Sequence, residues 1–382
     1  MDRKHFKVAG LGFNIEVEKP WKFMEYTPAV LARIKALSEG GSAEITPTRA
    51  GDKIPPRTLV RCKSDIPEEM DRRTLDLSQY EPFAEEGSDG FTLRVCACEP
   101  DWLLRARGEA PETEPEREQA PRGEAPYKPG TARGMKLIMS VDDFSPEYYI
   151  YSRNRDTIFE FSIDGKVTST LLFSSDHAKG ELYLPEDTKA YGAVLEIGTA
   201  LMMMYGFCGV FHGRVLFHSS VVETGGKAYM FLGKSGTGKS THARAWLENF
   251  PDCELLNDDN PIVWAHRGKT LVYGSPWSGK TPCYRKTFAE AGGIVRLRQA
   301  GENKISRIEG LDSFAAIMGS TATFRWEKDF MDKLYLILEE IATRTPCWQL
   351  DCLPDKEAAE LCREMITAPW KSQAGTSMDQ KQ

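Results

Sequence analysis

Residues 233–240 form the pattern G-x-x-x-x-G-K-[ST], which is typical of a phosphate-binding loop. Glycines at these spacings let the backbone take positive φ and turn several N–H groups toward one anion. The lysine would reach the β- and γ-phosphates of a nucleotide, and the final hydroxyl would ligate Mg²⁺. The alternative is a glycine-rich turn that binds nothing. The predicted nucleotide-binding residues are Gly233, Lys234, Ser235, Gly236, Thr237, Gly238, Lys239 and Ser240.

This loop has the flanking elements that the motif requires. Ala228–Leu232 has the pattern of a strand, and Thr241–Asn249 has that of a helix. Upstream, Gly225–Gly226 is the signal of a two-residue hairpin turn. Pairing about that turn places His218 opposite the first glycine of the loop, so we expect this histidine beside the phosphates. A hydrogen-bonded histidine in an ordinary strand is the alternative.

Two adjacent carboxylates, Asp258 and Asp259, follow an apolar segment over Cys253–Asn257 that predicts the next strand. A right-handed β-α-β crossover would run this strand in the same direction as the strand before the loop. Both strands would then end at one sheet edge, where open α/β sheets bind ligands. One carboxylate could hold Mg²⁺ through water, and the other could accept the proton of an attacking hydroxyl. A solvated acidic turn is the alternative.

The elements around these residues divide the chain into three parts. Residues 1–190 predict a β-rich module with a hairpin at Asp164-Gly165. Residues 191–370 predict an α/β domain, and residues 371–382 form a polar tail. Asp187–Phe211 predicts one helix packed between the two halves. Phe6–Val17 has β-type residues that are interrupted by Gly10 and Gly12. The other strands predicted in the first part are Leu59–Cys62, Phe91–Cys98, Met135–Val141, Tyr148–Arg153, Thr157–Ile163 and Lys166–Phe173.

The segment 105–133 has a different composition from the rest of the chain. It is rich in Pro, Glu, Arg, Gly and Ala, and it contains the sequence RGEAP twice. Such a composition offers too few core-forming residues to offset the entropy of ordering. We therefore expect a solvated insert or linker, with a docking segment as the alternative.

The overall composition excludes several classes of protein. The 382 residues carry a formal net charge of −7, which argues against non-specific binding to nucleic acid or to anionic membranes. Nine scattered cysteines without a C-x-x-C pair fit reduced thiols in a cytoplasmic protein. The N-terminus has no apolar segment typical of a signal peptide, and the apolar run 197–211 is short for a membrane span.

In this order, the histidine, the phosphate-binding loop and the aspartate pair resemble the C-terminal catalytic domain of HPr kinase/phosphorylase. The Ser-Gly-Thr-Gly-Lys core is equally similar to ATP-dependent phosphoenolpyruvate carboxykinase, whose nucleotide domain is related. The resemblance covers roughly residues 215–308 and implies a P-loop kinase domain behind a β-rich module.

The resemblance also implies a role for each matching residue. Lys239 and Ser240 would bind phosphate and Mg²⁺, Asp258 would be the base, and Asp259 would be the metal partner. His218 would polarise the site. Residues 293–296, Gly-Ile-Val-Arg, are similar to the family's Gly-Ala-Val-Arg. This likeness implies that Arg296 contacts the transferring phosphoryl group, and an exposed strand face is the alternative.

This chain departs from the family in one segment. The family's Glu-Ile-Arg-Gly segment, whose glutamate helps to bind metal, would fall within residues 273–280, which contain no glutamate. This puts the second metal contact and the family's phosphorylase activity in question. Lys280 would compensate by binding phosphate directly.

The sequence and the resemblance together predict a phosphotransferase that uses Mg-ATP or Mg-GTP. The expected acceptor is a hydroxyl, foremost a serine of a protein or peptide, with free serine or another small alcohol as the alternative. Carboxykinase chemistry on oxaloacetate and nucleotide sensing without catalysis are two further hypotheses. The oligomeric state stays open, and a homo-oligomer is compatible with the sequence.

Overall fold

A computed structural model describes residues 1–39, 73–87, 89–108, 127–141, 147–279, 281–321 and 324–367. The chain splits into two compact units, each with its own sheets and helices, so the mixed α/β class is confirmed. The division follows the long apolar helix, whereas the sequence placed the boundary before it, at residue 190. Unit 1 is Met1–His212 with Phe324–Phe330, and unit 2 is Gly213–Thr323 with Met331–Gln382.

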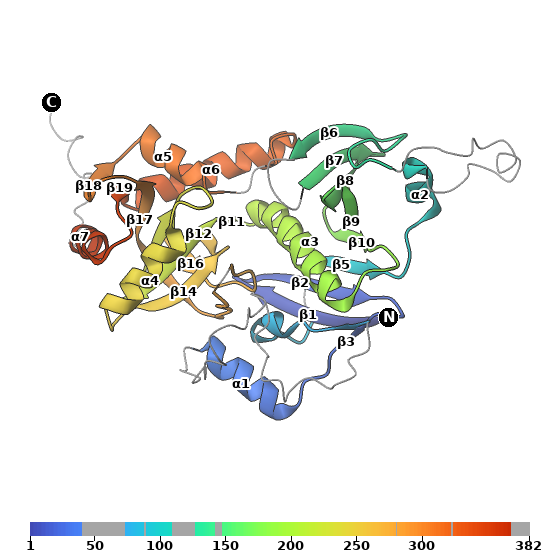
Figure 1. Ribbon diagram of the computed structural model, residues 1–382, viewed down its shortest axis with the longest axis horizontal. Helices are drawn as coiled ribbons and strands as arrows, with labels where there is room; N and C mark the ends of the chain where they lie inside the picture. The colour runs from blue at the N-terminus through green and yellow to red at the C-terminus, as the bar shows by residue number, and fades with distance from the viewer. Residues whose placement is uncertain are drawn as a thin grey trace, which may run out of the picture. The chain divides into compact units, whose positions relative to one another are not determined.

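Unit 1 contains an eight-stranded sheet in the order β1-β2-β5-β10-β9-β8-β7-β6 (Figure 1). The hairpin predicted at Asp164-Gly165 is confirmed, since both residues have positive φ (51° and 73°) and the flanking strands pair. The predicted strand over 59–62 lies outside the described residues. The strands are β1 (Asp2–Val8), β2 (Leu11–Val17), β5 (Phe91–Cys96), β6 (Lys136–Val141), β7 (Glu147–Arg153), β8 (Asp156–Ile163), β9 (Lys166–Phe173) and β10 (Lys179–Tyr183).

Short elements complete the described part of unit 1. Strands β3 and β4 pair in parallel as a separate two-stranded sheet. The Thr27 hydroxyl caps the first helix by accepting a hydrogen bond from the Val30 N–H. These elements are β3 (Lys22–Phe23), α1 (Pro28–Ser38), β4 (Thr74–Leu75), the 3₁₀ helix η1 (Ser78–Phe83) and α2 (Asp101–Arg107).

Helix α3 (Ala190–Phe211) is the core helix of unit 1. It is the one helix within the described residues that is long and apolar enough to cross a membrane, and 56% of its most apolar stretch is buried in the protein. A Cβ on Gly180 of β10 would lie 2.5 Å from the Met204 sulfur, so a glycine there lets helix and sheet approach closely. The Tyr205 hydroxyl donates to the Val8 carbonyl over 2.8 Å. These contacts show that the helix packs against the sheet of unit 1.

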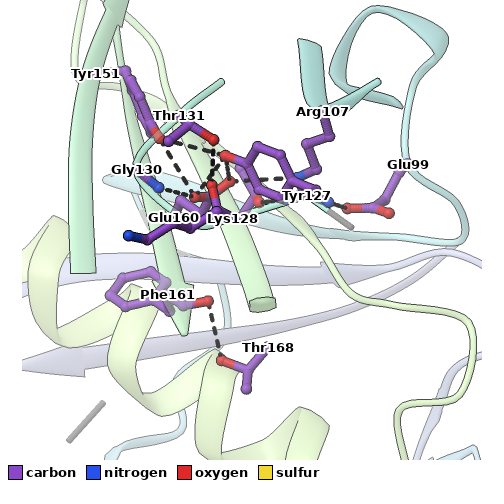
Figure 2. Close-up of polar contacts among 11 residues, drawn as sticks. Glu99, Arg107, Tyr127, Lys128, Gly130, Thr131, Tyr151, Glu160, Phe161 and Thr168 are labelled. Carbon is purple, nitrogen blue, oxygen red and sulfur yellow. Dashed lines mark hydrogen bonds and ion pairs between the residues drawn. The ribbon is translucent and has the colours of Figure 1, made fainter. Parts of the chain in front are cut away.

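Both ends of the segment 105–133 are folded, so the predicted insert is too wide at each end. Figure 2 shows the buried Glu160 carboxylate of β8 between them. Arg107 pairs with Glu160 over 3.3 Å from one end, and Tyr127 donates to it over 2.9 Å from the other. The Gly130 N–H also donates to Glu160, over 3.2 Å. Residues 109–126 lie outside the described part of the chain.

Unit 2 contains a nine-stranded sheet with the main order β11-β15-β16-β17-β13-β12-β14. Two-residue links, 217–218 and 260–261, join β11 to β12 and β14 to β15. Each link reaches about 10 Å, yet the joined strands would be about 24 Å apart in a flat sheet. The sheet must therefore curl strongly. Its strands are β11 (Arg214–Leu216), β12 (Ser219–Thr224), β13 (Lys227–Leu232), β14 (Glu254–Asp259), β15 (Ile262–His266), β16 (Lys269–Tyr273), β17 (Phe288–Gln299), β18 (Lys304–Ile308) and β19 (Cys347–Cys352).

One face of this sheet carries the core of unit 2. Helices α4 (Lys239–Asn249) and α7 (Lys356–Thr367) pack there against β12, β13, β17 and β19 (Figure 1). Trp246 of α4 is fully buried among these strands. This packing fixes the start of α4 relative to the ends of the strands. The remaining helices are α5 (Leu311–Met318) and α6 (Lys328–Arg344).

Candidate functional site

The phosphate-binding pattern forms the turn between β13 and α4. Gly233, Gly236 and Gly238 have φ values of 154°, 81° and 100°, as the sequence pattern predicts for a loop that curls around an anion. A Cβ on Gly233 would lie only 2.5 Å from the Thr237 hydroxyl oxygen. Gly238 is the N-cap of α4 and no side chain caps this helix, so its first N–H groups are left for a ligand.

Lys239 lies at the first position of α4, with 7% of its surface exposed. Its Nζ donates to the carbonyl oxygens of Gly233 (2.9 Å) and Lys234 (3.2 Å) and lies 2.9 Å from His218 Nε2. Burial lowers the pKa of Lys239 below its ordinary value, and the charges of the two neighbouring aspartates partly oppose this shift. The loop's own carbonyls thus hold the lysine where phosphate oxygens could take their place.

His218 connects Lys239 to Asp259. An ammonium group can only donate, so with Lys239 charged Nε2 accepts and the ring proton resides on Nδ1. Nδ1 lies 3.0 Å from Asp259 Oδ1 and donates to that carboxylate. Ser219 pairs with Leu232, which is the register that the Gly-Gly turn predicts. The predicted position of His218 beside the loop is therefore confirmed.

The aspartate pair lies at the same sheet edge as the loop. Strands β13 and β14 both run antiparallel to β12, so they point in one direction with β12 between them. The expected common direction is thus confirmed, although the two strands are not neighbours. The pair Asp258 and Asp259 ends β14, as the loop follows the end of β13.

Asp258 is buried, with 2% of its surface exposed. The Ser220 hydroxyl donates to its Oδ1, and this hydroxyl also lies 3.4 Å from Ser240 Oγ. Asp258 Oδ2 is buried and has no hydrogen-bond partner among the described residues. Burying a carboxylate oxygen without a partner is costly, so a cation bound at this atom would be favourable.

Asp259 has the backbone strain that is often found at functional sites. Its φ is 144°, which is unusual for any residue except glycine. Ser278 bridges to it, and a Cβ on Gly279 would lie 3.2 Å from the Asp259 Cβ. Residues 278 and 279, within the segment where the resemblance would place a metal-binding glutamate, therefore lie against Asp259. Lys280, the next residue, lies outside the described part of the chain.

Arg296 is exposed on β17 and lies beside Leu232, the residue before the phosphate-binding loop. Its neighbours Val295 and Leu297 face the core under α4, so Arg296 is on the opposite face of the sheet. Arg298, on the same face, pairs with Asp351 over 2.8 Å. The structure thus places Arg296 near the loop, and it shows no contact of Arg296 with Lys239, Asp258 or Asp259.

Sequence patterns did not identify two residues that lie near this site. Gln299 at the end of β17 donates to the Gly236 carbonyl over 3.1 Å and so steadies the loop. Ser220 reaches Asp258 because β12 and β14 pair, and Ser220 is directly opposite Asp258 in that pairing. The only signal for Ser220 was its position two residues after His218.

The residues present fit a Mg²⁺ ion. Ser240 and Asp258 supply oxygen atoms, the donor type that Mg²⁺ prefers, and one of these oxygens is the buried, unpartnered Oδ2. Among the described residues, no three His, Cys, Asp or Glu side chains gather as a metal site. That is compatible with Mg²⁺, which usually takes one or two protein carboxylates and completes its shell with water and phosphate.

No protein-family model and no curated protein matches this sequence. The geometry of the loop, the aspartates and the residues between them is therefore the basis for assigning a function.

Proposed function

We propose that this protein is a kinase that transfers the γ-phosphoryl group of Mg-ATP or Mg-GTP to a hydroxyl, foremost a serine of a protein or peptide. The observation that supports it is that Lys239, Ser240 and two aspartates lie around one loop whose glycines have positive φ. A P-loop kinase fold of the HPr kinase and carboxykinase type is part of this proposal. A cytoplasmic location is also part of it, in keeping with the eight free cysteines among the described residues.

The binding step follows from the loop geometry. Phosphate oxygens would accept hydrogen bonds from the first N–H groups of α4, and Lys239 would exchange the carbonyls of Gly233 and Lys234 for the β- and γ-phosphates. Ser240 and one aspartate would hold Mg²⁺. When bound, this ion neutralises charge that develops on the phosphates.

The transfer step needs a base and a group that stabilises charge. The other aspartate would accept the proton of the attacking hydroxyl. His218 would orient the carboxylate that it contacts, Asp259, and would keep Lys239 directed toward the phosphates. Arg296, exposed beside the loop, would approach the transferring group only in the loaded enzyme.

Calorimetric titration of ATP tests the binding site directly. Lys239→Ala removes a charge-assisted hydrogen bond, so we expect the affinity to fall by roughly 1.5–3 kcal/mol, which is about 10- to 150-fold. Lys304→Ala on β18 removes the same charge from an exposed position and serves as the matched control. Equal affinities for the wild type and Lys239→Ala would refute the nucleotide site.

A nucleotide-sensing module without catalysis is the second candidate. It is favoured by the residues beside Asp259, which are Ser278 and Gly279 where the resemblance would require a metal-binding glutamate. Radiolabelled ATP with a lysate, serine-bearing peptides and free serine separates the two functions. Tight ATP binding without labelling of any acceptor would favour the sensor.

A further inference from the structure

One buried hydroxyl links the phosphate-binding loop to the aspartate pair. Ser220 of β12 has 1% of its surface exposed and stands opposite Asp258 of β14. Its hydroxyl donates to Asp258 Oδ1 and lies 3.4 Å from Ser240 Oγ. Ser220 therefore touches both a carboxylate and the hydroxyl that ends the loop.

The number of protons on the Ser220 hydroxyl determines which of the two serines can donate a hydrogen bond to the other. A serine hydroxyl has one proton and two acceptor lone pairs. Since Ser220 gives its proton to Asp258, it can only accept from Ser240. If Ser240 donates its proton to Ser220 in this way, the lone pairs of Ser240 are left for a cation.

The two aspartates are held in different surroundings. Asp258 faces the Ser220–Ser240 link and keeps its buried Oδ2 without a protein partner in the described residues. Asp259 contacts His218 instead, and 28% of its side chain is exposed. A buried carboxylate that Ser220 links to Ser240 suits a metal ligand, whereas a partly exposed carboxylate can meet an incoming hydroxyl.

We propose that Ser220 is a positioning residue that joins Asp258 and Ser240 as the two protein arms of the Mg²⁺ site, which leaves Asp259 as the base. This inference rests on the proposed kinase function. It reverses the roles that the resemblance implies for the two aspartates.

The transfer step balances under this assignment. The acceptor oxygen forms a bond to the γ-phosphorus, and the bond from that phosphorus to the β–γ bridging oxygen breaks. The electron pair of the broken bond leaves on ADP. The proton of the acceptor hydroxyl passes to the Asp259 carboxylate, whose hydrogen bond from His218 holds it in place.

Mn²⁺ bound with a non-hydrolysable ATP analogue gives a readout that does not depend on activity. Electron paramagnetic resonance of free Mn²⁺ would measure its affinity in the wild type, Ser220→Ala and Ser220→Thr. We expect a loss of roughly 10- to 100-fold in Ser220→Ala, the range for removing a partner of a metal ligand. Ser220→Thr keeps the hydroxyl and suits a strand, so it should restore most of the affinity.

Ser219→Ala is the matched control. Ser219 is the adjacent buried serine of β12, and its hydroxyl has no partner among the described residues. It should keep the wild-type Mn²⁺ affinity, and metal-free binding of the analogue should be equal in all four proteins. Wild-type Mn²⁺ affinity in Ser220→Ala would overturn the role of Ser220 and leave the nucleotide site standing. A wild type that binds no analogue would overturn both proposals.

Discussion

At the scale of single residues, the two aspartates differ in what they touch, although they are adjacent in sequence. Asp258 meets a hydroxyl and Asp259 meets an imidazole, because neighbouring side chains on a strand point to opposite faces. The strained φ of Asp259 adds to this separation. The pair is thus equipped for two tasks, and amide substitutions can distinguish them.

We expect Asp259→Asn to bind nucleotide and metal almost as the wild type does and to lose roughly 10²–10⁴-fold in turnover, because it lacks a base. Asp258→Asn should instead lose the Mg²⁺ dependence of nucleotide affinity. Calorimetry with and without Mg²⁺, beside radiolabelled transfer, measures both. Wild-type turnover in Asp259→Asn would contradict the assignment of the base.

Sequence patterns predicted where several residues of this site lie, whereas the roles of these residues stay predictions. The glycines, Lys239 and His218 could be placed because a loop motif and a two-residue turn are local signals. Ser220 could not be placed in this way, because its contact with Asp258 depends on the pairing of β12 with β14. The two contacting residues are 38 positions apart in the sequence. A serine in a strand carries no sign of its partner until that pairing is known.

At the scale of elements, the packing of α4 holds the phosphate-binding loop that precedes it. His242 on its second turn has 6% of its surface exposed and lies edge-on against Phe231. Its Nε2 accepts a hydrogen bond of 3.2 Å from the Trp246 indole. Burial lowers the pKa of His242 to about 4. The helix that presents Lys239 is therefore built on a neutral histidine.

The stability of this unit should fall as the pH drops from about 6.5 toward 4. In this range His242 is protonated in the unfolded chain but stays neutral in the folded protein, so protonation favours unfolding. At pH 5 the loss amounts to about 2 kcal/mol relative to neutral pH. Urea unfolding at pH 7.5 and pH 5 measures it. The variant His242→Gln has no side chain at this position that titrates in this range. Its loss of stability between pH 7.5 and pH 5 should therefore be smaller than that of the wild type by about 2 kcal/mol. Equal losses in the two proteins would contradict the role of His242.

The long helix shows what element patterns leave open. α3 is apolar on nearly all sides, so its sequence predicts burial without saying which sheet it covers. The structure packs it on β5, β9 and β10 of unit 1. That choice moves the division between the units from residue 190 to residue 212.

At the scale of the whole molecule, the segment 105–133 is folded at both of its described ends, residues 105–108 and 127–133. The sequence predicted its solvation from composition, but composition could not show that Arg107 would pair with Glu160, 53 residues away. That partner stabilises both ends, since Arg107 and Tyr127 share one buried carboxylate. The hydroxyls of Tyr127 and Tyr151 and the Gly130 N–H also donate hydrogen bonds to Glu160.

Replacing residues 109–126 by a short Gly/Ser linker should leave the melting temperature almost unchanged, because their composition offers little apolar area to bury. Arg107→Ala should instead cost about 3–5 kcal/mol, since it leaves the Glu160 charge buried without its cation. Arg105→Ala, which breaks an exposed pair on the same helix, is the control. A large drop in the linker variant would show that the replaced residues pack on unit 1.

The shared carboxylate of Glu160 also gives the protein an entry point for engineering. Because positions 107 and 127, which are twenty residues apart in the sequence, contact the same side chain, the described chain before residue 109 and after residue 126 is held at nearly one place. A domain whose own termini are close together, such as a fluorescent reporter, could be inserted between positions 107 and 127 without disrupting the sheet of unit 1.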